Sequence, residues 1–157
     1  MNLAFLSRKT GKALKNKGQT LVTAESCTGG WVAQAVTSVA GSSDWFERGY
    51  VTYSNAAKRG ELGVRMTTLA RHGAVSEQAA REMARGALKN GRGTIALSVT
   101  GIAGPGGGAP GKPVGTVCFG WAQGRKIASE TKRFRGGRNS VRRQSVIHAL
   151  RGLLKWL

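Results

Sequence analysis

Strand-like and helix-like patterns alternate along this 157-residue chain, and this order restricts the possible folds more than any other feature. The expected strands span about residues 20–24, 49–53, 94–100, 114–122 and 126–134, the last two joined as a hairpin. The expected helices span about residues 3–17, 31–39, 56–58, 67–72, 77–90 and 140–156. Such an order predicts an α/β protein: a three-layer α/β/α sandwich around a mixed sheet of about five strands.

The length of the chain suits one domain, residues 1–157, with a proper hydrophobic core. Its two cysteines, Cys27 and Cys118, make no disulfide framework and fit a reducing compartment. The first six residues are too short for a signal peptide, and no apolar run approaches about 18 residues. We therefore expect a cytoplasmic protein that does not associate with membranes.

The charge balance is strongly basic, because 25 Lys and Arg against 7 Asp and Glu give a formal net charge of +18. Such an excess attracts polyanions, so a nucleic-acid-binding module is one interpretation. A phosphorylated small-molecule substrate fits the same charge. The basic residues are scattered, and only residues 132–143 form a dense cluster. Nucleic-acid binding stays open without being favoured.

The turn at residues 24–30, AESCTGG, joins an expected strand to an expected helix. Ser26 lies in this turn, near backbone N–H groups that the start of a helix leaves without partners. Ser26 either caps the helix, which is the commoner role for a serine there, or acts as a nucleophile. In the second role its oxyanion meets those N–H groups. The residues of the turn alone favour the role of helix cap over that of nucleophile for Ser26.

A loop rich in Gly and Pro, residues 101–115, follows the expected central strand. It matches the start of a P-loop, but Pro113 stands where Ser or Thr binds magnesium, and it matches a dinucleotide fingerprint only formally. Both motifs need a helix directly afterwards, whereas residues 114–119 are strand-like. Open α/β sheets bind ligands at the carboxyl ends of their strands, so Thr100 and Gly101 are candidate site residues. A purely structural loop is the alternative.

Lys58 and Tyr53 are candidate acid–base residues. Lys58 is expected in the first turn of a helix, where the dipole and any burial favour a neutral amine. Arg138 precedes the final helix, an arrangement that suits a phosphate group. Each residue also has a plainer interpretation as a solvated surface side chain. His72 and His148 have no ligand-spaced partners, so we predict neither a metal site nor a histidine-dependent triad.

Six motifs occur along the chain in an order that resembles one known family. They are AESCTGG at 24–30, GSS at 41–43, TYSNAAK at 52–58, GAVS at 73–76, TGIAGP at 100–105 and KPVGTV at 112–117. The chain resembles the CinA C-terminal domain family over about residues 3–154. Stand-alone members of that family are nicotinamide-nucleotide amidohydrolases.

The resemblance implies an α/β/α fold and hydrolysis of the carboxamide of nicotinamide mononucleotide (NMN) to nicotinate mononucleotide and ammonia, in pyridine nucleotide recycling. It implies catalytic roles for Ser26, Tyr53 and Lys58 and site roles for Thr100 and Arg138. We expect NMN as the small-molecule partner, no cofactor, no metal, and a homo-oligomer, in the form of a dimer.

The resulting hypothesis is a serine amidase in which neutral Lys58 takes the proton of Ser26. Arg138 holds the 5′-phosphate, and Thr100 and Gly101 hold the nucleotide body. The backbone N–H groups that stabilise the oxyanion are expected from Cys27, Thr28, Gly29 and Gly30.

The chain departs from the family at two positions near this expected site. Gly137 replaces the Asp of a Gly-Asp-Arg motif, and Gly106 replaces an acid that usually follows Gly-Pro. Both changes remove negative charge near the expected site. They bear on substrate affinity and on the order of the loops more than on the reaction, because the catalytic positions are intact. The alternatives are an amidase for another carboxamide, a catalytically silent paralogue, and a nucleic-acid-binding module.

Overall fold

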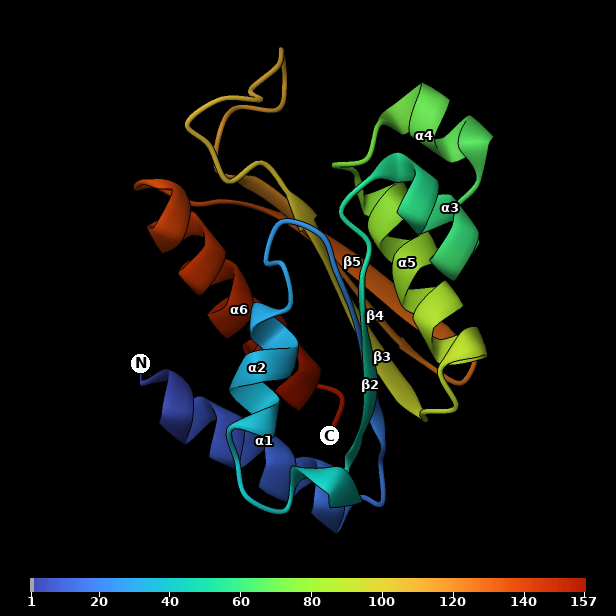
Figure 1. The fold of residues 1–157 in the computed structure, drawn as a ribbon, viewed down its shortest axis with the longest axis vertical. Coiled ribbons are helices and arrows are strands. Elements are labelled where there is room, and N and C mark those ends of the chain that lie inside the picture. Colours follow the sequence, from blue (N-terminus) through green and yellow to red (C-terminus); the bar gives the residue numbers. More distant parts are fainter. Residues whose placement is uncertain (1) are drawn as a thin grey trace.

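The computed structural model describes residues 2–157, which form one sheet with helices on both faces (Figure 1). The strands are β1 (Leu21–Glu25), β2 (Phe46–Val51), β3 (Ile95–Gly101), β4 (Thr116–Gln123) and β5 (Lys126–Arg133). The helices are α1 (Leu3–Asn16), α2 (Trp31–Thr37), α3 (Asn55–Leu62), α4 (Met66–His72), α5 (Glu77–Asn90) and α6 (Arg138–Leu154), with a 3-10 turn at Ser42–Asp44. The predicted α/β fold with a mixed sheet is confirmed.

The strand order is β2-β1-β3-β4-β5. β1 is parallel to β2 and β3, while β4 and β5 form the predicted antiparallel hairpin beside β3. The register pairs Glu25 with both Val51 and Val99, so the carboxyl ends of the three parallel strands meet at one edge. Open α/β sheets bind their ligands at such an edge.

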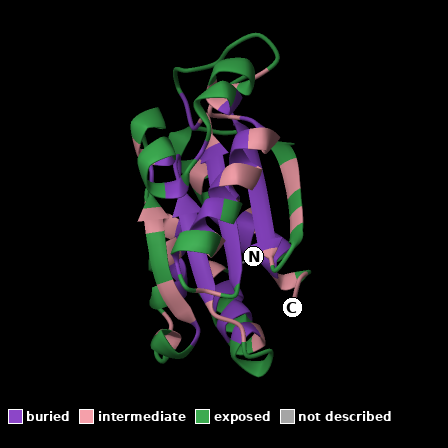
Figure 2. Ribbon diagram, turned by 90° about the vertical axis from the view of Figure 1, so that its right-hand side faces the viewer, coloured by how far each residue is buried: buried purple, intermediate pink, exposed green. Residues whose placement is uncertain are grey.

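Helices α1, α2 and α6 cover one face of the sheet, and α3, α4 and α5 lie on the other (Figure 1). The larger core forms under the first group, with Leu14, Phe119 and Leu150 fully buried. A smaller core under α5 includes Val22 and Met83. Figure 2 shows the central strands buried between exposed outer helix surfaces. No helix of residues 2–157 combines the length and apolar character needed to cross a membrane.

Several element boundaries differ from the prediction, most clearly those of β2, α3 and α6. β2 begins earlier than expected and ends before residues Thr52 and Tyr53, because the carbonyls of both turn out of the sheet to accept hydrogen bonds from a lysine amine. α3 continues through Gly60 and ends at Leu62, followed by the C-cap Gly63, whose φ of 68° is readily adopted only by glycine. α6 starts two residues earlier than expected.

Candidate active site

The turn after β1 places Ser26 at the carboxyl edge of the sheet. The N–H of Ser26 still donates to the carbonyl of Val99 in β3 at 2.9 Å, which fixes the serine to the sheet. The N–H of Gly29 then donates to the Ser26 carbonyl at 3.0 Å, and Gly29 and Gly30 adopt φ values of 60° and 101°. Residues with a Cβ are strained there, so the glycine pair lets the chain enter α2 directly behind the serine.

Glu25, and not Ser26, satisfies the start of α2. The N-cap of this helix is a glycine without a side-chain hydrogen bond. The fully buried carboxylate of Glu25 accepts hydrogen bonds from the N–H groups of Val32 (2.9 Å) and Ala33 (3.0 Å). It also accepts one from the Thr28 hydroxyl at 2.6 Å. The interpretation of Ser26 as the helix cap is therefore wrong, and its hydroxyl has a different partner.

That partner is Lys58, which reaches the turn from α3. Its side chain is almost completely buried, and Nζ lies 3.0 Å from Ser26 Oγ. Nζ also donates to the backbone carbonyls of Thr52 (3.0 Å) and Tyr53 (3.1 Å). A neutral amine has two N–H donors and one lone pair, so the two carbonyls occupy both donors. The lone pair is then left for the proton of the Ser26 hydroxyl.

The surroundings of Lys58 favour this neutral form. Burial lowers the pKa of Lys58, because the ammonium ion loses its hydration. No carboxylate of residues 2–157 lies within ion-pair distance of its Nζ. Burial also raises the pKa of the neighbouring Cys27 thiol to about 12. Cys27 therefore stays protonated near neutral pH and does not compete with Ser26 as a nucleophile.

Arg142 of α6 holds the turn from the opposite side. Its Nε donates to the Cys27 carbonyl at 3.0 Å and its Nη2 to the Thr28 carbonyl at 3.2 Å. The guanidinium also lies over the Trp31 ring, 5.5 Å from its centroid. The C=O and N–H of a trans peptide point in opposite directions, so the N–H of Thr28 points away from Arg142. Among the described residues, neither this N–H nor that of Cys27 has an acceptor.

A pocket of about 270 Å³, here the Ser26 pocket, opens over Ser26 and Lys58. Its wall includes five more of the predicted site residues: Cys27, Tyr53, Thr100, Gly101 and Arg138. The remaining predicted residues, Thr28, Gly29 and Gly30, do not line it. The N–H of Gly29 is also occupied within the turn, so Gly29 cannot serve as the expected oxyanion donor.

Tyr53 and Arg138 form the rim of the Ser26 pocket. Arg138 Nη2 donates to the Tyr53 hydroxyl at 3.0 Å, and Nη1 donates to the Gly104 carbonyl at 2.8 Å. The Tyr53 side chain is 62% exposed. Its hydroxyl contacts Arg138, whereas only its backbone carbonyl contacts Lys58. The hydrogen bonds to Tyr53 and Gly104 use only part of the Arg138 guanidinium, so its other N–H groups remain for an anion at the mouth of the pocket.

Thr100 and Gly101 form the wall at the end of β3. The Thr100 hydroxyl donates to the Ala74 carbonyl at 2.9 Å, which ties β3 to the segment before α5. A Cβ on Gly101 would lie 2.7 Å from Val117, so close packing against β4 requires glycine there. Both residues therefore shape the pocket.

Three residues near Ser26 received no site role from the sequence. Asn55, the first residue of α3, lines the Ser26 pocket. Glu25 is detectable in principle, because an acid near a helix start is a known stabilising pattern. Arg142 has no local signal, because its acceptors lie 115 and 114 residues earlier in the chain.

The positions that depart from the family motifs lie close to the site. Gly106 lines the Ser26 pocket, and Gly137 is the N-cap of α6, with no side chain to satisfy the helix start. Neither His72 nor His148 lines this pocket. His148 instead lies 2.9 Å from a carboxylate oxygen of Glu130.

Proteins of one family match this chain over nearly its whole length. The family model described as CinA C-terminal domain matches residues 3–157. The nicotinamide-nucleotide amidohydrolase PncC of Escherichia coli is 56% identical over 152 residues, which cover 96% of this chain and 92% of that protein. PncC of Pseudomonas putida is 49% identical over 153 residues, with coverages of 98% and 96%.

A solved structure shows the same similarity in three dimensions. A CinA superfamily protein from Klebsiella pneumoniae matches with a TM-score of 0.96 at 41% identity, covering 99% of this chain and 97% of that one. The family predicted from the six motifs is confirmed: the chain belongs to the CinA C-terminal domain family.

Proposed function

We propose that this protein hydrolyses the carboxamide of NMN to nicotinate mononucleotide and ammonia and so contributes to pyridine nucleotide recycling. The observation that most supports an amidase is the 3.0 Å contact between Ser26 Oγ and the buried amine of Lys58. The substrate is inferred from relatives named nicotinamide-nucleotide amidohydrolase, which are 56% and 49% identical to this chain.

In the first half-reaction, Lys58 accepts the proton of Ser26 while Oγ bonds to the carboxamide carbon. The oxyanion that develops accepts hydrogen bonds from the N–H groups of Cys27 and Thr28. The Lys58 ammonium then gives its proton to the amide nitrogen, and the C–N bond breaks. Ammonia leaves, and the nicotinoyl group remains as an ester on Ser26.

In the second half-reaction, a water molecule attacks the ester carbon while neutral Lys58 takes its proton. Collapse of the tetrahedral intermediate breaks the bond to Ser26 Oγ, which recovers a proton from Lys58. Nicotinate mononucleotide is released, and the site returns to its starting state.

Substrate contacts are assigned to the rim and wall of the Ser26 pocket. Arg138 binds the 5′-phosphate through N–H groups that Tyr53 and Gly104 leave free. We assign Tyr53 to substrate contact and not to proton transfer, because its hydroxyl lies at the rim beside Arg138 and only its backbone carbonyl contacts Lys58. Thr100 and Gly101 shape the wall against the nucleotide body.

The test is ammonia release from NMN. Ser26→Ala should lower turnover by roughly 10³-fold or more, because it removes the covalent step. Ser43→Ala changes an exposed serine outside the pocket and should leave turnover near the parental value. Parental rates from Ser26→Ala would contradict the nucleophile.

The alternative of an amidase for another carboxamide is separated by substrate comparison. NMN, nicotinamide riboside and nicotinamide share the reacting group but differ in the phosphate and the sugar. If Arg138 binds the phosphate, NMN has the highest kcat/KM of the three, and Arg138→Gln reduces that preference. Equal kcat/KM for NMN and the riboside points to a substrate without a phosphate.

A further inference from the structure

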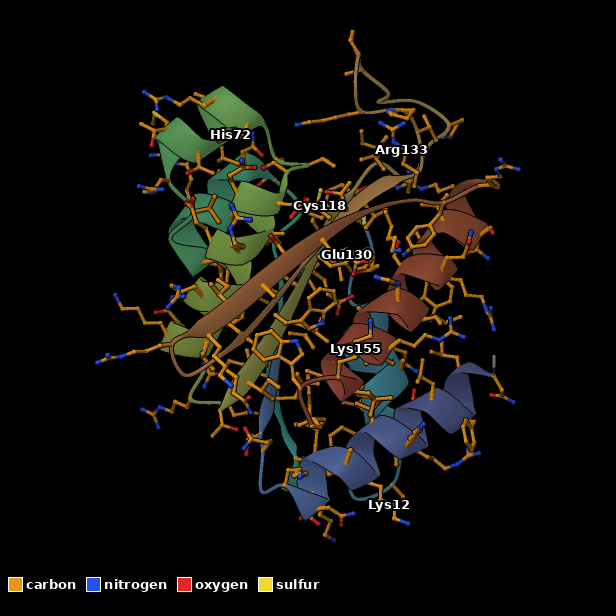
Figure 3. The ribbon with its side chains drawn as sticks, turned by 180° about the vertical axis from the view of Figure 1, so that it is seen from behind. Lys12, His72, Cys118, Glu130, Arg133 and Lys155 are labelled. Atoms are coloured by element: carbon orange, nitrogen blue, oxygen red, sulfur yellow. The ribbon has the colours of Figure 1, made fainter. Side chains whose placement is uncertain are left out.

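A second hollow of about 580 Å³, here the Arg133 hollow, lies on the α5 side of the sheet. Its wall comes from α4, the start of α5, the loop before β4, and strands β4 and β5. Figure 3 labels three of its lining residues, His72, Cys118 and Arg133, which lie in the same upper region of the molecule. Its volume is in the range of about 300–1,000 Å³ that suits a small ligand.

The wall of the Arg133 hollow is strongly cationic. Four charged basic side chains line it: Arg71, Arg81, Lys112 and Arg133. Glu77 is the one carboxylate among its lining residues, and its oxygens accept hydrogen bonds from the hydroxyls of Ser129 and Thr131, each at 2.8 Å. Arg81 lies 4.0 Å from Glu77. Within the described part of the chain, the other three cations have no carboxylate in ion-pair distance.

Two of these three cations are held in place by backbone carbonyls. The amine of Lys112 donates to the carbonyl of His72 in α4. Nη2 of Arg133 donates to the carbonyl of Gly111 at 3.4 Å. Each side chain keeps further N–H donors for a ligand. Ordering them in advance reduces the entropy that binding has to overcome.

We propose that the Arg133 hollow is a second anion site, which binds a phosphorylated small molecule. Arg and Lys donate strong charge-assisted hydrogen bonds to phosphoryl oxygens. Among residues 2–157, no Phe, Tyr or Trp lines the hollow and His72 is its one aromatic ring, so it offers no row of stacking platforms for successive bases of a single strand of nucleic acid. Recognition therefore rests on the phosphoryl group. Binding here does not depend on the proposed amidase reaction.

The loop between β3 and β4 connects the two sites. Gly104 and Gly107 of this loop line the Ser26 pocket, whereas Gly111 and Lys112 line the Arg133 hollow. Val75 lines both. An anion that binds Lys112 therefore contacts the same loop that forms one wall of the Ser26 pocket.

Titration with inorganic tripolyphosphate, followed by calorimetry and amide chemical shifts, tests the site on the full chain. We expect one binding site with shifts at His72, Lys112 and Thr131. The double variant Arg71→Gln/Arg133→Gln should weaken binding by about 10-fold or more, because it removes charged hydrogen bonds to the anion. Lys112→Gln should weaken it as well and provides a second variant if the double variant does not fold.

The matched control is Arg125→Gln/Lys126→Gln, which removes the same charge from the exposed β4–β5 turn. It should change the Kd by less than about twofold, because distant surface charges are screened.

Equal losses of affinity in both double variants would assign binding to general surface charge. Shifts confined to Tyr53 and Gly104 would place the anion in the Ser26 pocket. Duplex DNA that binds more tightly than tripolyphosphate, and weakens equally in the Arg71/Arg133 variant, would indicate a nucleic-acid surface. Each of these three results overturns the proposal.

Discussion

At the level of single residues, the proposed chemistry depends on the protonation state of Lys58. The same three contacts suit either an ammonium ion or a neutral amine, but burial without a carboxylate partner favours the neutral amine. Ser26 alone has no other base within its turn, because Glu25 is committed to the start of α2. The proposed reaction therefore requires both Ser26 and Lys58.

The pH dependence of turnover follows from this pair. The pKa of Lys58 is lowered, and only its neutral form accepts the Ser26 proton, so kcat/KM should fall as the pH decreases through that pKa. The acid limb should lie below the ordinary pKa of lysine, because burial lowers the pKa of Lys58. Lys58→Arg should lose roughly 10³-fold because guanidinium stays charged, whereas Lys89→Arg on the surface should change little. An unchanged acid limb in Lys58→Arg argues against Lys58 as the base.

At the scale of elements, α6 supports the site at two successive turns. Arg138 is its first residue and lies at the rim of the Ser26 pocket, while Arg142, four residues later, holds the turn after β1. Residues at this spacing share one face of a helix. One helix face thus supplies a candidate substrate contact and a support for the proposed oxyanion donors.

We predict that Arg142 acts on kcat more than on KM. Arg142→Lys keeps the charge but loses the fork that holds both the Cys27 and Thr28 carbonyls, so the N–H groups behind them lose their orientation. Steady-state kinetics with NMN should show kcat reduced by about 10- to 100-fold and KM within about threefold. Arg143→Gln is the matched control, because Arg143 is exposed and lies outside the Ser26 pocket. A raised KM with normal kcat would instead indicate a substrate contact.

The start of α6 offers a stability test of one departure from the family motif. Gly137 has φ −74° and ψ 177°, which suits an N-cap, and a Cβ there would meet no atom within 4 Å. Gly137→Asp should raise the free energy of unfolding by a few tenths to about 1 kcal/mol in urea titrations. Gly136→Asp should destabilise the protein, because φ is 107° and its Cβ would lie 2.8 Å from Ser140. If Gly137→Asp lowers the free energy of unfolding, the inference that α6 lacks a stabilising N-cap side chain is wrong.

At the scale of the whole molecule, the net charge of +18 is only partly compensated by ion pairs. Most of the seven acids already contact basic side chains or, like Glu25, a helix start. Repulsion among the remaining cations opposes the folded state, and salt screens it. The Tm should therefore rise between about 0.05 and 0.5 M NaCl. A Tm that falls over this range would show that the ion pairs outweigh the repulsion.

Much of the fold was predictable because its signals are local. Ser76 caps α5 by accepting from Ala79, and Gly124 allows the tight turn of the β4–β5 hairpin, as the sequence indicates. The least accurate prediction was that of β2, because the end of this strand depends on the side chain of Lys58. Thr52 and Tyr53 have strand-forming side chains, but their carbonyls turn toward the Lys58 amine.

The order of the elements and the turn that presents Ser26 follow from local patterns, because caps, turns and periodicity involve residues near one another in the chain. The family follows from the resemblance of the six motifs. What surrounds that turn depends on how the chain folds. The tertiary structure buried Lys58, set Glu25 at the start of α2, brought Arg142 onto the Cys27 carbonyl, and grouped scattered cations into the Arg133 hollow. The physical reason is that burial and charge environment depend on packing between distant segments, which no local pattern records.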